Sequence, residues 1–277
     1  DCGPIALQGL PRIEQVFVDA DEALLAMDFE RALYLARRAA EKTLAALAEF
    51  YVVSLSTSTI GYKAMVLPDA LLPLFPDLAR PELASSVVVF HQRFSTNTAP
   101  AWKLAQPFRL LAHNGEINTI EGNRHWSIAR GARWSTPRVD FAQLQPLVSL
   151  QGSDSQSLDN MLEALLVGGM DLLQAMRILI PPATQSLEYK DADLAAFYEY
   201  YALNSEPWDG PAGIVLFDGR YAACTLDRNG LRPARWQLTQ DRHFLIASEA
   251  GVWDVPSAQV VRKGKLGPGQ MIAAALR

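Results

Sequence analysis

The chain has 277 residues, of which 49% are hydrophobic and 20% are charged. This balance excludes a disordered chain, which lacks the apolar surface needed to offset the entropy of ordering, and it fits one large domain or two small ones. No stretch approaches the roughly 18 consecutive apolar residues that a membrane-spanning helix needs. The net charge of −5 gives no overall positive field, so we expect neither a nucleic acid nor a membrane as partner.

The sequence contains two cysteines, Cys2 and Cys224. Two are too few for a disulfide framework or a cysteine-rich zinc site. This usage suits a reducing compartment, so we expect a cytoplasmic location. The chain opens at Asp1, without Met and without the pattern of a signal peptide. We therefore expect a processed product or a piece of a longer protein.

The first third of the chain is predicted to combine one long helix with short strands. Residues 28–50 have a helical period, with an apolar stripe and a charged side that we expect to face solvent. The stripe consists of Leu33, Ala36, Ala40, Leu44 and Leu47, and the charged side of Arg37, Arg38, Glu41 and Lys42. We then predict strands over 51–56 and 60–67, a short helix over 69–78 interrupted by prolines, a mostly buried strand over 85–93 and a strand over 110–113.

The remainder is predicted to be a helical block followed by strands. Helices are expected over 118–133, 153–166, 171–179 and 191–203. Strands are expected over 212–217, 220–226, 234–238 and 243–247, joined by Asp-Gly and Asn-Gly turns as an antiparallel meander. Strands, then helices, then strands favour the α+β class, with helices packed on sheet faces.

A polar cluster ends the predicted strand over 85–93, with the sequence His-Gln-Arg-Phe-Ser-Thr-Asn-Thr over 91–98. Arg93 has the side chain that grips a carboxylate with two parallel hydrogen bonds. The hydroxyls of Ser95 and Thr96 could complete a small polar pocket. The alternative is a strand end whose arginine makes a surface ion pair.

A second cluster surrounds Asn114-Gly115. An Asn-Gly pair between apolar flanks is first of all a type I′ hairpin turn. Such an exposed turn would also present the Asn114 amide and the Gly115 backbone N–H together, as two donors for an oxyanion.

Two further clusters are ambiguous by themselves. The sequence Gly-Ser-Asp-Ser-Gln-Ser over 152–157 opens a helix, where Ser153 or Asp154 could cap the first turn or Asp154 could receive an ammonium group. The segment 226–235 contains Arg228, Arg232 and Arg235, which turn chemistry alone does not explain. They are either fixed guanidinium groups that face inward, contacts to another domain, or a solvated turn.

Other kinds of site find little support. The histidines at positions 91, 113 and 125 have no i,i+4 pairing and no carboxylate-rich motif, so we expect no metal site. The chain has no G-x-S-x-G elbow, no P-loop and no G-x-G-x-x-G.

Together, the four clusters resemble the class II glutamine amidotransferase domain of the glutamate synthase large subunit, over nearly the whole chain. The strings that carry the resemblance are Leu10-Pro-Arg-Ile-Glu-Gln-Val-Phe-Val18, Phe90 to Thr98, Leu104-Ala-Gln-Pro-Phe-Arg109, Ala112 to Thr119, Ser153-Asp-Ser155, Glu206-Pro-Trp-Asp-Gly-Pro-Ala212 and Leu226 to Arg235. We therefore treat residues 1–277 as one partial domain of this type.

The resemblance implies an N-terminal-nucleophile hydrolase fold, in which two antiparallel sheets lie between helical layers. In such domains the thiolate of an N-terminal cysteine attacks the side-chain amide of L-glutamine, and ammonia and L-glutamate are released. Asn114 and Gly115 would form the oxyanion hole. Arg93, with Thr96 beside it, would hold the α-carboxylate, and Asp154 the α-ammonium group.

In the whole enzyme the ammonia would reach synthase domains that make glutamate from 2-oxoglutarate. The resemblance places FMN and an iron–sulfur cluster there, with no cofactor in this segment. The implied partners are those domains of the same polypeptide and a small electron-donating subunit.

The chain departs from the family pattern at its start. The family begins with Cys-Gly and an apolar strand, well before the string that starts at Leu10, whereas here Cys2-Gly3 lies seven residues from it and Pro4 follows. Proline suits a central strand poorly because it donates no ladder hydrogen bond. We expect residues 1–9 to correspond to a linker, the nucleophile to lie upstream, and this segment alone to be inactive. The alternative function is a non-catalytic amino-acid-binding or interaction module.

Overall fold

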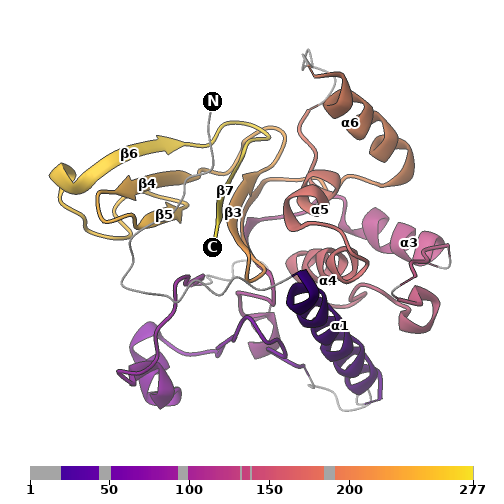
Figure 1. Ribbon diagram of the computed structural model, residues 1–277, viewed down its shortest axis with the longest axis horizontal. Coiled ribbons are helices and arrows are strands. Elements are labelled where there is room, and N and C mark those ends of the chain that lie inside the picture. The colour runs from indigo at the N-terminus through magenta and orange to yellow at the C-terminus, as the bar shows by residue number, and fades with distance from the viewer. Residues whose placement is uncertain are drawn as a thin grey trace.

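The computed structural model describes residues 20–43, 51–92, 99–131, 133–137, 139–183 and 191–276 (Figure 1). The helices are α1 Ala20–Thr43, α2 Leu71–Leu74, α3 Ile120–Gly131, α4 Asp154–Val167, α5 Leu172–Leu179 and α6 Ala192–Asn204. The strands are β1 Leu111–Gly115, β2 Ala212–Phe217, β3 Tyr221–Leu226, β4 Arg235–Thr239, β5 Phe244–Ala247, β6 Val260–Lys265 and β7 Met271–Ala275. No helix in these ranges is long and apolar enough to cross a membrane.

A four-stranded antiparallel sheet, in the order β1-β2-β3-β7, forms the centre of the fold. Its registers pair Ala112 with Val215 and Val215 with Cys224. Successive side chains of a strand point to opposite faces, and the burial of β2 follows this alternation. Ala212, Ile214 and Leu216 are fully buried on one face, and Val215 belongs to the other. This sheet therefore has two apolar faces, and each needs a cover.

Helices α4 and α5 cover the first face (Figure 1). The main core contains Leu158 and Leu162 of α4, Leu172 and Met176 of α5, and the inward side chains of β2. Ser153, one of the two candidate caps in the sequence, caps α4 by accepting a hydrogen bond from the backbone N–H of Gln156 at 3.1 Å.

A three-stranded sheet, in the order β5-β4-β6, covers the second face. Ile246 of β5 packs with Cys224 and Leu226 of β3 in a smaller core. The predicted meander is therefore wrong in one respect: β2-β3 and β4-β5 are hairpins of two different sheets. The connection between them carries Gly230, whose φ of +62° favours glycine. Two antiparallel sheets with helices confirm the α+β class.

The strands predicted over 51–56, 60–67 and 85–93 are wrong, because the described part of this region contains no strand. Val88 and Phe90 are 75% and 63% exposed, where a buried strand was expected. Valine and phenylalanine favour a strand only when a neighbouring strand supplies hydrogen-bond partners and packing, and no described segment does so here. The short helix interrupted by prolines is confirmed, as α2 between two 3-10 turns.

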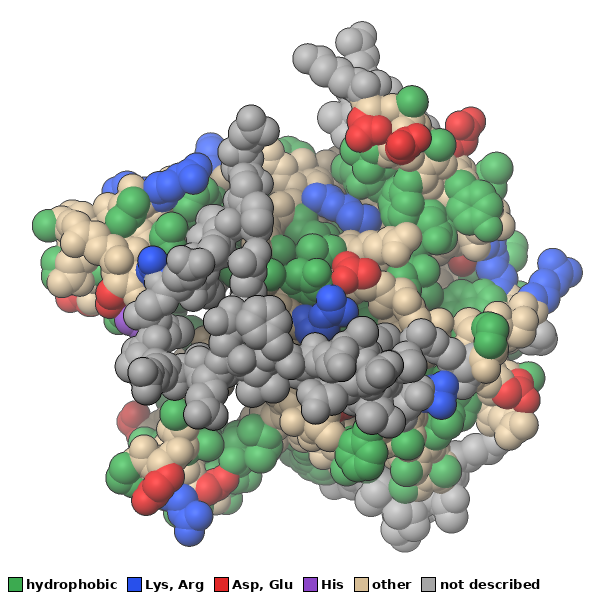
Figure 2. All heavy atoms as spheres, viewed as in Figure 1, with side chains coloured by type: hydrophobic (Ala, Val, Ile, Leu, Met, Phe, Trp, Pro, Cys, Tyr) green, Lys and Arg blue, Asp and Glu red, His purple; other side chains and the backbone are tan. Residues whose placement is uncertain are grey.

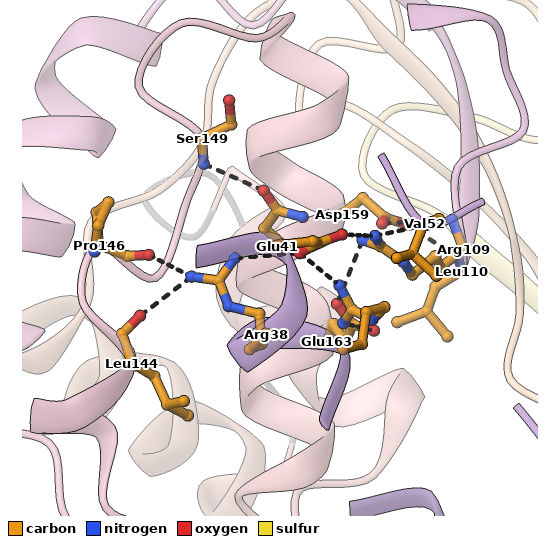
Figure 3. Close-up of polar contacts among 12 residues, drawn as sticks. Arg38, Glu41, Val52, Arg109, Leu110, Leu144, Pro146, Ser149, Asp159 and Glu163 are labelled. Atoms are coloured by element: carbon orange, nitrogen blue, oxygen red, sulfur yellow. Dashed lines mark hydrogen bonds and ion pairs between the residues drawn. The ribbon is translucent and has the colours of Figure 1, made fainter. Parts of the chain in front are cut away.

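The predicted solvent side of α1 is wrong at Arg37, which is 1% exposed. Its guanidinium pairs with Glu41 at 3.1 Å and with Glu163 of α4. Arg109 pairs with the same two carboxylates. Figure 3 shows Glu41, Glu163 and Arg109 converging between α1 and α4. A charge at a helical position can therefore face inward when a neighbouring helix supplies its counter-ion, which periodicity does not record.

Asp159 lies in this network without a direct ion pair to any residue that the structure describes. Its carboxylate accepts hydrogen bonds from the backbone N–H groups of Arg109 at 3.3 Å and Leu110 at 2.9 Å. Burial, followed by the nearby Glu163, raises the pKa of Asp159 to about 6. These backbone bonds fix the chain where it enters β1, so the network positions the strand that carries Asn114 and Gly115.

Candidate active site

The candidate site begins at the end of β1, an edge strand of the central sheet. The side chain of Gln106 holds the backbone of His113 on the open edge: it accepts from the N–H at 2.6 Å and donates to the carbonyl at 3.1 Å. Asn114 is half-buried and Gly115 is exposed. The last residues of β1 are thus held from both sides, by Gln106 and by β2.

Gly115 has a φ of +141°, a conformation open essentially to glycine. A Cβ there would lie 1.7 Å from the carbonyl oxygen of Pro211. The predicted hairpin turn at Asn114-Gly115 is wrong, because the chain continues towards α3 and the partner strand β2 begins only at Ala212. Glycine is required at position 115 because the backbone of Pro211 lies too close to leave room for a Cβ.

The Asn114 side chain is held by His91. Nε2 of His91 lies 2.7 Å from Oδ1 of Asn114, so a proton on Nε2 completes the hydrogen bond. This contact occupies the oxygen of the amide and leaves its NH₂ group directed elsewhere. An amide fixed by its oxygen is suited to donate to an anion.

Asp154 is the first residue of α4 and faces the loop after β1. Its Oδ2 accepts from the backbone N–H of Ile117 at 2.8 Å, and its Oδ1 from the N–H and hydroxyl of Ser155, at 2.7 and 3.1 Å. The Asp154 carboxylate thus joins the first turn of α4, which Ser153 caps, to the loop after β1. Asp154 therefore contacts the loop at Ile117, which is two residues after Gly115 in the chain.

His113 precedes Asn114 in β1, and its side chain is 3% exposed. Its Nδ1 is 2.9 Å from Oγ of Ser155 and 3.8 Å from Oδ2 of Asp154. Burial lowers the pKa of His113, and the Asp154 carboxylate opposes that effect. The ring is consequently held neutral at physiological pH.

The three arginines of the fourth cluster differ in position. Arg228 pairs with Asp209, and Arg235 is exposed at the start of β4. Arg232 packs against the backbone of Gly213: a Cβ added to Gly213 would lie 3.3 Å from the Cβ of Arg232. Gly213 pairs with Asn114 in the sheet, so Arg232 is the arginine of this cluster that lies beside the site. Its Nε is buried, and no described residue accepts a hydrogen bond from it.

Of the predicted site residues, Asn114 and Gly115 end β1, and Asp154 contacts their neighbours in the chain, His113 and Ile117. Arg93 and Thr96 lie outside the described residues, as does Cys2. Cys224 is buried in β3, and burial raises its pKa to about 12, so this thiol is not a nucleophile.

The sequence reasoning did not assign His91, His113, Ser155 or Arg232 to the site. The two histidines were considered only as metal ligands. Their positions carried a usable signal, because His113 directly precedes Asn114 and His91 lies two residues before Arg93. Ser155 and Arg232 are recognisable only from their neighbours in space.

Comparison with known proteins assigns the sequence to a family. The family model for class-II glutamine amidotransferases matches residues 1–277. The chain is 45% identical over 273 residues to the ferredoxin-dependent glutamate synthase 2 of Synechocystis. The aligned region covers 96% of this chain and 17% of that protein. It is 40% identical over 271 residues to the large chain of the NADPH glutamate synthase of Azospirillum brasilense, covering 96% of this chain and 18% of the relative.

The chain thus spans about a sixth of the length of these relatives. Among solved structures, a glutamine phosphoribosylpyrophosphate amidotransferase from B. subtilis aligns with a TM-score of 0.36 and 19% identity, over 66% of this chain and 31% of that one. The family match extends over every residue, including the segments around Asn114 and Asp154. The chain belongs to the class-II glutamine amidotransferases.

Proposed function

We propose that this chain forms the L-glutamine site of a glutamate synthase. The observation that carries the proposal is the contact between β1 and α4, where the Asp154 carboxylate of α4 accepts a hydrogen bond from Ile117, in the loop that directly follows the Asn114-Gly115 donors. A ligand with an amide at one end and an ammonium group at the other matches this pair of partners. Arg93 and Thr96 are proposed to bind its α-carboxylate.

In the proposed reaction a thiolate attacks the side-chain carbonyl carbon of glutamine. The carbonyl oxygen becomes negative and is stabilised by the Asn114 amide and the Gly115 N–H. The thiol proton is first taken up by a base, the α-amine of the nucleophilic cysteine. This base returns the proton to the leaving nitrogen as the C–N bond breaks, so that ammonia departs, and water then cleaves the thioester to release glutamate. Cys224 is too deeply buried to supply the thiolate, so the proposal assigns that role to a cysteine outside the described residues.

The ammonia is proposed to feed reductive amination of 2-oxoglutarate in glutamate biosynthesis, in the cytoplasm. An iron–sulfur cluster takes four protein ligands, usually cysteines, and this chain has two cysteines. Such a cluster and FMN are therefore proposed to belong to other domains of the same polypeptide, with a separate electron-donating subunit as a further partner.

Titration of the 277-residue chain with L-glutamate, the proposed product, tests the site. We expect binding that Asp154→Asn weakens at least about tenfold, since the variant loses a charge-assisted hydrogen bond. Asp193→Asn, on the exposed start of α6, is the matched control and should bind as the parent does. A parent chain that binds no glutamate would overturn the proposal.

Ammonia release from L-glutamine by the full-length gene product tests the chemistry. Release by the 277-residue chain itself, abolished in Cys2→Ala, would assign the nucleophile to Cys2. Glutamate binding without ammonia release by the full-length product would favour the second candidate, a non-catalytic amino-acid-binding module.

A further inference from the structure

The Asp154 carboxylate is almost fully engaged by its own protein. An ionised carboxylate offers about four lone-pair positions to donors. Three are occupied here, by the N–H of Ile117, the N–H of Ser155 and the hydroxyl of Ser155. About one position remains for a ligand, and its direction depends on how the other three hold the carboxylate.

The proton of the Ser155 hydroxyl decides which contacts are possible. Since Ser155 donates it to Oδ1 of Asp154, the 2.9 Å contact between Oγ and Nδ1 of His113 needs a proton on Nδ1. A neutral imidazole has a single N–H, so this direction requires the proton on Nδ1 rather than a ring N–H that donates to the nearby backbone of Pro211. The hydrogen bonds then run in one direction, from His113 through Ser155 to Asp154.

His113 is rigidly placed at the other end of this chain of bonds. Its backbone makes two hydrogen bonds with the side chain of Gln106, and Asn114 follows it in β1. The charged and titratable groups that face its ring are Asp154 of α4, His91 of the segment before β1, and Arg232 of the β3–β4 connection. The ring therefore spans the distance between the strand end and the helix start.

We propose that His113 and Ser155 are positioning residues that fix the Asp154 carboxylate relative to Asn114-Gly115 for the α-ammonium group of an amino acid. This inference rests on the proposed function. It adds that the hydroxyl of Ser155 and the Nδ1 proton of His113 determine ammonium recognition, although neither residue touches the ligand. Because the chain of bonds starts at the residue before Asn114, it also sets the spacing between the two ends of the ligand.

Paired ligands separate positioning from a general structural role. L-Glutamate carries the α-ammonium group and glutarate lacks it, while both carry the two carboxylates. We expect Ser155→Ala to weaken the binding of L-glutamate about tenfold, which corresponds to the loss of one hydrogen bond to a charged group. The binding of glutarate should be unchanged. Ligand-observed NMR titration of the 277-residue chain measures both dissociation constants into the millimolar range.

Two variants of His113 supply the matched comparison. Asparagine places an amide nitrogen near the position of Nδ1, whereas glutamine places one near Nε2. We expect His113→Asn to retain most of the preference for L-glutamate over glutarate, and His113→Gln to lose about tenfold of it. Urea unfolding of each variant verifies that it remains folded under the titration conditions.

Each outcome decides a different question. A parent chain that binds no L-glutamate overturns the proposed function. The positioning role alone is overturned if the parent binds L-glutamate and Ser155→Ala weakens the binding of L-glutamate and glutarate equally. It is also overturned if Ser155→Ala weakens the binding of neither ligand. Equal preferences in His113→Asn and His113→Gln also contradict it, because a structural role does not distinguish the two nitrogens.

Discussion

At the scale of single residues, the site depends on backbone conformations that side chains would prevent. Gly115 combines a φ of +141° with a contact to Pro211 that leaves no room for a Cβ. Gly122, in the first turn of α3, has open space around an added Cβ. These two glycines differ in environment, and substitution by alanine should have opposite effects.

We expect Gly115→Ala to lower the free energy of unfolding by at least about 2 kcal/mol, through backbone strain and the clash with Pro211. Gly122→Ala should raise it by up to about 1 kcal/mol, because alanine is the better helix former. Urea unfolding measures both values. A Gly115→Ala chain as stable as the parent would contradict the close approach described here.

At the scale of elements, buried charges link α1 to α4. Arg37 is fully buried with Glu41 and Glu163 beside it, and the buried Asp159 lies in the same network. Removing one partner of a buried pair leaves a charge without compensation, which costs more than the pair contributes. Substitution of one charged residue of the network should therefore destabilise the fold more than substitution of both members of a pair.

Arg37→Met should lower the free energy of unfolding by about 3 kcal/mol, since it leaves three acidic groups near Arg109. Adding Glu163→Gln removes one of those charges, and the double variant should recover part of the loss. A double-mutant cycle by urea unfolding gives the coupling between the two positions. Strictly additive effects would show that the two side chains do not interact.

At the scale of the whole molecule, apolar side chains gather on the surface of residues 55–90. Figure 2 shows green side chains on the lobe at the lower left, where Figure 1 places this region. The exposed ones are Leu55, Ile60, Met65, Val66, Leu67, Leu72, Leu74, Leu83, Val88 and Phe90. An apolar surface of this extent promotes association in water.

We expect the isolated chain to self-associate as its concentration rises, and Val88→Ser with Phe90→Ser to reduce this. Both side chains are largely exposed, so the free energy of unfolding should change by less than about 0.5 kcal/mol for each. Sedimentation velocity over a range of concentrations measures the association. Leu203→Ser, an equally exposed change on α6, is the control, and a parent chain that stays monomeric would contradict the prediction.

How well the sequence predicted each helix or strand depends on whether the residues that stabilise it are close in the chain or distant. Helices α3 to α6 and strands β2 to β5 were predicted near their observed bounds, because their periodicity and caps are local. Strands β6 and β7 were missed, since Val-Val-Arg-Lys-Gly-Lys and Met-Ile-Ala-Ala-Ala show no clear alternation. The strands predicted between residues 51 and 93 failed because a strand also needs a neighbour.

The sequence by itself determined the class of the fold, helices α3 to α6, and the motifs around Asn114, Gly115 and Asp154 that resemble those of class II glutamine amidotransferases. Those features depend on neighbours in the chain or on strings that a family shares. Only the tertiary structure decided that Gly115 is required by Pro211, that Arg37 is buried, and that His113 reaches Asp154 through Ser155. The partners in these three contacts lie between 42 and 126 residues apart in the chain, so their energies depend on packing that local pattern does not encode.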